Sequence, residues 1–260
     1  MKYKRIVINE PHASIEGLYD EHLGFWDIDE EFFNDVVLKW TDWHTDYLFH
    51  GNRIDGVRTV RFPYSRFIVD AERLWDDPLE RKGQGILYTR FGRYVRNIPD
   101  ENRSNLLGLW HQHQAKLRKN LCPDALLLDC HSFPSELSDV DICIGYNEDW
   151  SKPHRDVIEC AVNLFEDHGY KVGVNEPYSN SETPDCPFQY QSMMLEVNKK
   201  AYMDEHSLRI RHDHKYKKNV RDLMLHLLSE LSENNSFLGQ DNLLLRVKKA
   251  QPTVLFCLYV

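Results

Sequence analysis

Two histidines stand at the ends of predicted strands, where their ring nitrogens could bind a metal ion. His12 comes directly after the apolar run 5–8 and a short break that contains a proline, and His131 lies near the carboxyl end of a second apolar run, 125–133. In open α/β sheets, ligands gather at the carboxyl edge of the strands. Catalytic zinc sites usually combine three nitrogen or oxygen ligands with one open position. The pair therefore indicates a zinc site, although two hydrogen-bonded structural histidines explain the same residues equally well.

An acidic third ligand has more than one candidate. Apolar residues recur at helical spacing from about residue 29, with Gly51 as the terminator, so residues 29–51 are predicted to be helical. Asp42 and Asp46 then fall one turn apart on one face, and one carboxylate could bind metal while the other supports a histidine. Glu16 is a further candidate, but a first-turn carboxylate stabilised by a helix dipole explains it as well.

Strands and helices alternate along the rest of the chain. Short apolar runs predict strands, and amphipathic stretches bounded by Ser, Pro or Gly predict helices. The further predicted strands are residues 57–62, 141–147 and 188–198, and the predicted helices begin near residues 104, 153 and 217. This alternation predicts one α/β domain over residues 1–260, in three layers with a mostly parallel or mixed central sheet.

Composition narrows the classes of partner. The 260 residues include 41 acidic and 32 basic side chains, and the net charge of -9 argues against nucleic acid or an anionic membrane as the main partner. No apolar run is long enough to span a membrane, and the amino terminus does not read as a signal peptide, so we expect a cytoplasmic protein. The six cysteines contain no CxxC pair, which predicts neither a disulfide framework nor a thiolate metal site. The apolar run 242–260 is expected to pack on the body of the protein or on another subunit.

The order of several short motifs resembles the N-formylglutamate amidohydrolase family. They are Pro-His with small residues, Asp-Trp-His-x-Asp, Tyr-Ser-Arg with a following Asp and Arg, Asp-x-His-Ser, a Gly-x-Asn element, Asn-x-Pro-aromatic, and Leu-Glu followed by Tyr-Met-Asp-Glu. Here they read PHAS (11–14), DWHTD (42–46), YSRFIVDAER (64–73), DCHS (129–132), GYNED (145–149), NEPY (175–178) and LEVNKKAYMDE (195–205). One such motif is weak, but all of them in family order over residues 7–205 make the resemblance specific.

The resemblance implies a zinc-dependent amidohydrolase with a fold related to the zinc carboxypeptidases and aspartoacylases, that is, a zinc-exopeptidase-like (phosphorylase/hydrolase-like) fold. His12, His131 and an acidic residue, Asp42 or Asp46, would hold zinc or another divalent cation. Glu196 would be the general base, although a strand-end ion pair is the alternative for that residue.

The resemblance also implies a set of substrate-binding residues. Arg73 and Arg66 would hold a substrate carboxylate or the developing oxyanion, with surface ion pairing as their alternative role. Asp70 would orient one of these arginines, and Asn175 of the NEPY motif would contact substrate.

Two departures from the family pattern bear on the substrate. Glu72 stands where the family has Asn beside Arg73, and the segment after Val174 lacks the Gly-Gly loop of true formylglutamate hydrolases. A carboxylate beside the arginine should weaken binding of a doubly negative substrate. We therefore expect hydrolysis of the amide bond of a neutral or cationic N-acyl amino acid or short peptide. The alternative is a catalytically idle family member that binds a metabolite or a protein partner in the same cleft.

Overall fold

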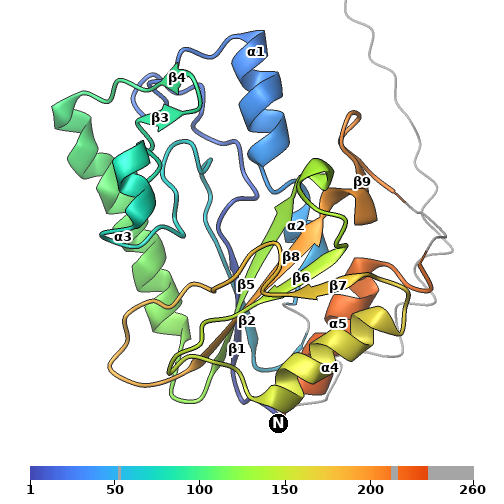
Figure 1. Cartoon of the computed structure of the whole chain (residues 1–260). Coiled ribbons are helices and arrows are strands. Elements are labelled where there is room, and N and C mark those ends of the chain that lie inside the picture. The colour runs from blue at the N-terminus through green and yellow to red at the C-terminus, as the bar shows by residue number, and fades with distance from the viewer. Residues whose placement is uncertain (52–53, 212–215, 234–260) are drawn as a thin grey trace, which may run out of the picture.

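A six-stranded mixed sheet forms the centre of the protein (Figure 1). The computed structural model describes residues 1–51, 54–211 and 216–233. The sheet order is β2-β1-β5-β8-β6-β7. The strands are β1 (Ile6–Glu10), β2 (Val57–Arg61), β5 (Leu126–Phe133), β6 (Ile142–Gly145), β7 (Val172–Val174) and β8 (Gln191–Asn198).

Four neighbouring strands run in the same direction. β1 is parallel to both β2 and β5, and β5 is parallel to β8, whereas β6 is antiparallel to β8 and parallel to β7. The carboxyl ends of β1, β5 and β8 therefore meet at one edge of the sheet. Side chains alternate between the faces of a strand, so Asp129 and His131 share the face opposite Leu128 and Cys130.

Helices cover both faces of the sheet. Helix α3 (Asp100–Asn120) packs on β1 and β2, and a small core that includes Val7, Leu117 and Leu127 fills that interface. On the other face lie α2 (Thr45–Leu48), α4 (Arg155–Glu166) and α5 (Val220–Leu231), over the largest apolar core. The structure thus confirms the predicted three-layer α/β fold with a mixed sheet. No helix in the described part of the chain is long and apolar enough to cross a membrane.

A cap made by residues 15–40 and 62–98 lies at the end toward which β1 and β5 run (Figure 1). Its regular elements are short, and its aromatic side chains form a separate core. They are α1 (Glu30–Phe32), the π-helical turn η1 (Phe33–Leu38), η2 (Pro78–Lys82), β3 (Arg90–Phe91) and β4 (Tyr94–Val95). The remaining short elements, outside the cap, are η3 (Ser135–Leu137), η4 (Lys199–Ala201), β9 (Met203–Asp204) and β10 (Arg209–Ile210).

One buried guanidinium holds the cap segments together. Arg96 is 2% exposed and donates to the carbonyl oxygens of Gly24 (2.6 Å), Leu23 (2.7 Å), Ile68 (2.9 Å) and Tyr88 (3.3 Å). Backbone carbonyls in loops need partners when they are buried. Arg96 therefore satisfies carbonyl oxygens that backbone amides would have satisfied in a regular sheet.

The predicted helix over residues 29–51 is wrong in its second half. The helical turns of α1 and η1 end near residue 40, and α2 begins only at Thr45. Between them His44 has a φ of 62°, and the Asp42 amide donates to the carbonyl oxygen of His12 (3.0 Å) instead of to a helical partner. Long-range pairing with His12, two residues past the end of β1, thus overrides the local helical pattern.

Other predicted boundaries shift by a few residues. Helix α3 begins at Asp100 rather than near Ser104, with Pro99 at its N-cap. The five cysteines in the described residues are free thiols, and Cys257 lies outside those residues. The apolar run 242–260 also lies outside the described residues, so its predicted packing stays a prediction.

We predict that Arg96→Met lowers the free energy of unfolding by about 3 kcal/mol, because several buried carbonyls lose their donor at once. The measurement is urea denaturation followed by tryptophan fluorescence. Arg93→Met is the matched control, since the contacts of Arg93 with Glu31, Asp35 and Tyr94 are exposed, and it should leave the midpoint nearly unchanged. Equal midpoints for the two variants would show that the cap does not depend on Arg96.

Candidate active site

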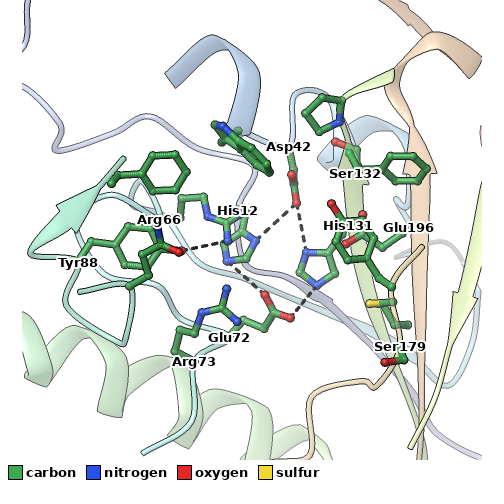
Figure 2. Close-up of a pocket in the computed structure, with 17 residues that line it drawn as sticks. His12, Asp42, Arg66, Glu72, Arg73, Tyr88, His131, Ser132, Ser179 and Glu196 are labelled. Carbon is green, nitrogen blue, oxygen red and sulfur yellow. Dashed lines mark hydrogen bonds and ion pairs between the residues drawn. The ribbon is translucent and has the colours of Figure 1, made fainter. Parts of the chain in front are cut away.

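A cavity of about 520 Å³ opens where the cap meets the carboxyl ends of β1, β5 and β8 (Figure 2). Clefts of this size with a few converging polar groups are typical binding sites. The predicted site residues that line it are His12, Asp42, Arg66, Glu72, Arg73, His131 and Glu196. Residues distant in the sequence are therefore brought together at the sheet edge, as the strand-end positions predicted.

The inner ring nitrogens of two histidines converge on one carboxylate. His12 and His131 have ring centroids 5.1 Å apart. The Oδ2 atom of Asp42 lies 3.6 Å from Nδ1 of His12 and 3.2 Å from Nδ1 of His131. All three residues are buried, and one ligand atom from each lies within 4.8 Å of the others. This is the spacing that a single metal ion can bridge.

One atom of this group supports that assignment directly. Among the described residues, Nδ1 of His12 is buried without a hydrogen-bond partner, as is Nε2 of His131 on the opposite side of the pair. A buried polar atom without a partner is costly, so it calls for an absent ligand. Two imidazole nitrogens and a carboxylate oxygen form the donor set typical of a catalytic zinc site, and the residues present fit such an ion.

Further carboxylates face the outer ring nitrogens. Nε2 of His12 bonds to Oδ1 of Asp70 at 2.8 Å, and Nε2 of His131 lies 3.0 Å from Oδ1 of Asp129. The carboxylate of Glu72 approaches both outer nitrogens, at 3.7 Å from His12 and 3.9 Å from His131 (Figure 2). Such carboxylate partners fix the tautomer and the orientation of metal-binding histidines.

The electrostatics keep Asp42 and Asp70 charged. Burial alone would raise the pKa of Asp42, but the neighbouring imidazoles of His12 and His131 outweigh it and hold that pKa well below its usual range. Burial is likewise outweighed at Asp70, whose pKa is lowered by His12, Arg66 and Arg73. The ionised forms are those that can bind a cation or orient an imidazole.

Glu196 lies beside His131 and faces the cavity. The register of β5 and β8 pairs these two residues, so their side chains share a face of the sheet. Among the described residues, Oε2 of Glu196 has no hydrogen-bond partner. Burial raises the pKa of Glu196 to about 8, opposed by His131 and reinforced by Asp42 and Glu72. A carboxyl group with a pKa near neutrality can accept and return a proton.

Two guanidinium groups line the same cavity. Arg66 Nη2 donates to Oδ2 of Asp70 at 3.0 Å, and Arg73 Nε lies 3.7 Å from that oxygen. Nη1 of Arg73 also lies 3.7 Å from Asp77. Asp70 is thus shared between two guanidinium groups, and Asp77 also pairs with Arg73. Guanidinium groups bind carboxylates with paired hydrogen bonds.

Three sequence candidates are not brought into this group. Asp46 is 43% exposed, and its carboxylate pairs with Arg61 at 3.2 Å, because the turn at residues 41–44 rotates it away from Asp42. The side chain of Asn175 accepts a bond from the amide of Tyr146 at 2.9 Å and does not line the cavity. Glu16 is exposed and lies outside the group.

Some residues around the site carry no recognisable sequence signal. The Tyr88 hydroxyl donates to Oδ2 of Asp70 at 2.6 Å, but Tyr88 stands in a loop without a motif. Lys199 is 1% exposed and donates to the carbonyl oxygen of Lys39, which anchors the segment before Asp42. Burial lowers the pKa of Lys199 to about 8. Only Asp129, two residues before His131 in the DCHS motif, could have been found by its spacing.

Comparisons with known proteins agree with the motif pattern. A crystal structure of N-formylglutamate amidohydrolase from Ralstonia eutropha is similar in fold, with a TM-score of 0.69 and 17% identity over 89% of this chain and 94% of that chain. A gene product from Agrobacterium tumefaciens is also similar, with a TM-score of 0.55 and 15% identity over 88% of this chain and 92% of that chain. Among curated proteins, no significant match is found.

The strongest comparison is with a family model, which covers all of the elements that build the site. The model for N-formylglutamate amidohydrolase matches residues 5–203. This range runs from β1, before His12, past Glu196 at the carboxyl end of β8. The chain therefore belongs to the N-formylglutamate amidohydrolase family.

Proposed function

We propose that this protein is a metal-dependent hydrolase that cleaves the amide bond of a small N-acyl amino acid or short peptide, with zinc as the preferred ion. The observation that carries the proposal is the convergence of His12, His131 and Asp42, with an unpartnered Nδ1 on His12, directly beside the unpartnered carboxylate oxygen of Glu196. Membership of an amidohydrolase family supports the reaction class. The sequence-based expectation of a cytoplasmic protein is retained as part of this proposal.

Nδ1 of His12, Nδ1 of His131 and Oδ2 of Asp42 would hold the ion. We assign the Nδ1 side because both Nδ1 atoms face the same carboxylate oxygen of Asp42. On the opposite side, Nε2 of His12 bonds to Asp70, while Nε2 of His131 faces Asp129 at 3.0 Å without a hydrogen bond. A divalent ion supplies Lewis-acid polarisation of the amide carbonyl and lowers the pKa of water. Another divalent cation can bind the same ligands, because nitrogen and oxygen donors discriminate weakly between metals.

In this proposal Glu196 transfers the protons, and two arginines bind the substrate. Glu196 accepts a proton from the attacking water while the water oxygen bonds to the carbonyl carbon. When the C–N bond breaks, Glu196 returns that proton to the leaving nitrogen, which yields an acid and an amine. Arg66 and Arg73 bind the substrate carboxylate.

Glu72 has two consequences in this proposal. Its carboxylate lies beside both outer histidine nitrogens and so makes the imidazoles better electron donors to a cation. It also adds negative charge to a cavity that must accept an anionic substrate, which favours substrates with one carboxylate over those with two.

We predict that His12→Ala and His131→Ala each lose bound zinc while keeping the fold, because each removes one of three ligands. Elemental analysis of purified protein gives the metal content, and circular dichroism checks the fold. Asp46→Ala should keep its zinc, since Asp46 lies outside the group. Zinc loss in Asp46→Ala with retention in His12→Ala would reverse the ligand assignment.

We predict that Glu196→Gln keeps its metal but hydrolyses N-formyl amino acids at least ~10²-fold more slowly, because an amide cannot take the proton from water. Release of the free amine measures the rate. Glu136→Gln, a matched change at an exposed residue paired with Lys39, should retain full activity. Unchanged turnover by Glu196→Gln would assign the base to another residue.

We predict that Glu72→Gln weakens zinc binding by ~10-fold or more, since outer carboxylates commonly tune metal affinity by this amount. Competition with a chromophoric chelator measures the dissociation constant without any substrate. Glu16→Gln is the control and should bind zinc as the unmodified protein does. Equal affinities for all three proteins would mean that Glu72 acts on substrate alone.

A further inference from the structure

The cavity that holds the histidine pair has two apolar walls that belong to different parts of the fold. On the cap side, Trp40 and Tyr88 both contact Phe91, with ring centroids 5.7 Å and 5.9 Å apart. At the strand ends, Phe133 contacts Tyr178 with ring centroids 5.8 Å apart. All five aromatic rings line the cavity. In Figure 2, Tyr88 lies across the histidines from Glu196 and Ser179.

These walls are backed by packed cores and keep the cavity open. Tyr88 and Phe133 are each 1% exposed and belong to separate apolar clusters. Trp40, Phe91 and Tyr178 are only half-buried, so each keeps apolar surface that a ligand could cover. Burial of such surface is favourable in proportion to its area. Because the cavity is pre-formed, ligand binding does not lose the entropy needed to order its walls.

Aromatic rings form part of the cavity lining, and polar groups form much of the rest. A formyl or other small acyl group and one carboxylate suffice to meet the histidine cluster, Glu196 and the two arginines. A cavity of about 520 Å³ falls in the range that encloses drug-sized molecules. A substrate made only of those small polar groups would leave the aromatic walls in contact with water.

One wall includes the aromatic residue of the NEPY motif. Tyr178 occupies the aromatic position of that motif, residues 175–178, and its ring lines the cavity. Its place at the cavity wall bears on which side chains or acyl groups fit.

We propose that the cavity selects N-acyl amino acids that carry a single carboxylate and one large apolar group, aromatic or branched aliphatic. The inference rests on the proposed amidohydrolase function and names its substrate class. The apolar group fills the space between the two aromatic walls, while the carboxylate meets Arg66 and Arg73. The apolar group can belong to the amino-acid side chain or to the acyl group, and separate substrates distinguish the two.

Steady-state kinetics of the zinc-loaded protein on a substrate panel tests this. We expect kcat/KM for N-formyl-L-phenylalanine or N-formyl-L-leucine to exceed that for N-formyl-L-alanine and N-formyl-L-glutamate by at least about tenfold. N-phenylacetylglycine tests the case in which the apolar group is the acyl group. Highest kcat/KM on N-formyl-L-glutamate or N-formyl-L-alanine would overturn the inference while leaving the amidohydrolase function intact.

Tyr178→Ala tests the wall itself. We expect it to lower the ratio of kcat/KM for the best apolar substrate to that for its small counterpart by about fivefold or more, because a ligand contact is removed. The counterpart is N-formyl-L-alanine for an apolar side chain and N-acetylglycine for an apolar acyl group. Tyr19→Ala is the matched control, since Tyr19 is 66% exposed and does not line the cavity. A ratio unchanged in Tyr178→Ala would contradict a role for this wall in selection.

Binding to the metal-loaded Glu196→Gln variant separates selection from catalysis. Calorimetry compares N-acetyl-L-phenylalanine and N-phenylacetylglycine with N-acetyl-L-glutamate and N-acetylglycine. Tighter binding of either apolar ligand supports the inference, and if the unmodified protein then cleaves none of the panel, the proposed function fails while the selectivity stands. Equal or tighter binding of the glutamate derivative overturns the inference whatever the rates are.

Discussion

The rest of the site depends on the burial of two imidazoles between carboxylates. Asp42 faces the inner nitrogens of His12 and His131, while Asp70, Asp129 and Glu72 face the outer ones. Several negative charges this close together in a buried site repel one another and lose hydration. Within the protein, Arg66, Arg73 and the Tyr88 hydroxyl compensate only Asp70 directly. A cation between the inner nitrogens would compensate Asp42, and this is the physical reason to expect a metal.

The fold supplies this arrangement from parts far apart in the chain. Parallel strands bring His12 and His131 to one edge, and the register of β5 with β8 adds Glu196 to the same face. The cap then contributes Arg66 and Glu72, and Asp42 follows directly after the cap segment 15–40. Because the cap has little regular structure, side chains such as Arg96 and Lys199 replace the missing backbone pairing. The sheet side and the cap also contribute one apolar wall each to the cavity, and the proposed substrate selection depends on these two walls.

Strand-end position and motif order were enough to predict the α/β fold, the family and the pair His12 and His131 as neighbours. The helical period was misleading at Asp42 and Asp46, because a left-handed His44 and a long-range backbone bond break the helix between them. Asn175 carried a motif, yet its side chain serves the turn before Tyr146. Tyr88 and Lys199 could not be predicted, because their partners are set by tertiary packing rather than by spacing. Local patterns thus located the strand ends, but not the contacts that the cap makes with them.

The central claim is that a cation binds on the Nδ1 side of the histidine pair. Crystals of the unmodified protein grown with zinc, measured at the zinc absorption edge, locate the ion directly. The account predicts one anomalous peak about 2.0–2.2 Å from Nδ1 of His12, Nδ1 of His131 and a carboxylate oxygen of Asp42. A peak on the Nε2 side beside Glu72, or a map with no peak between the two rings, would contradict it.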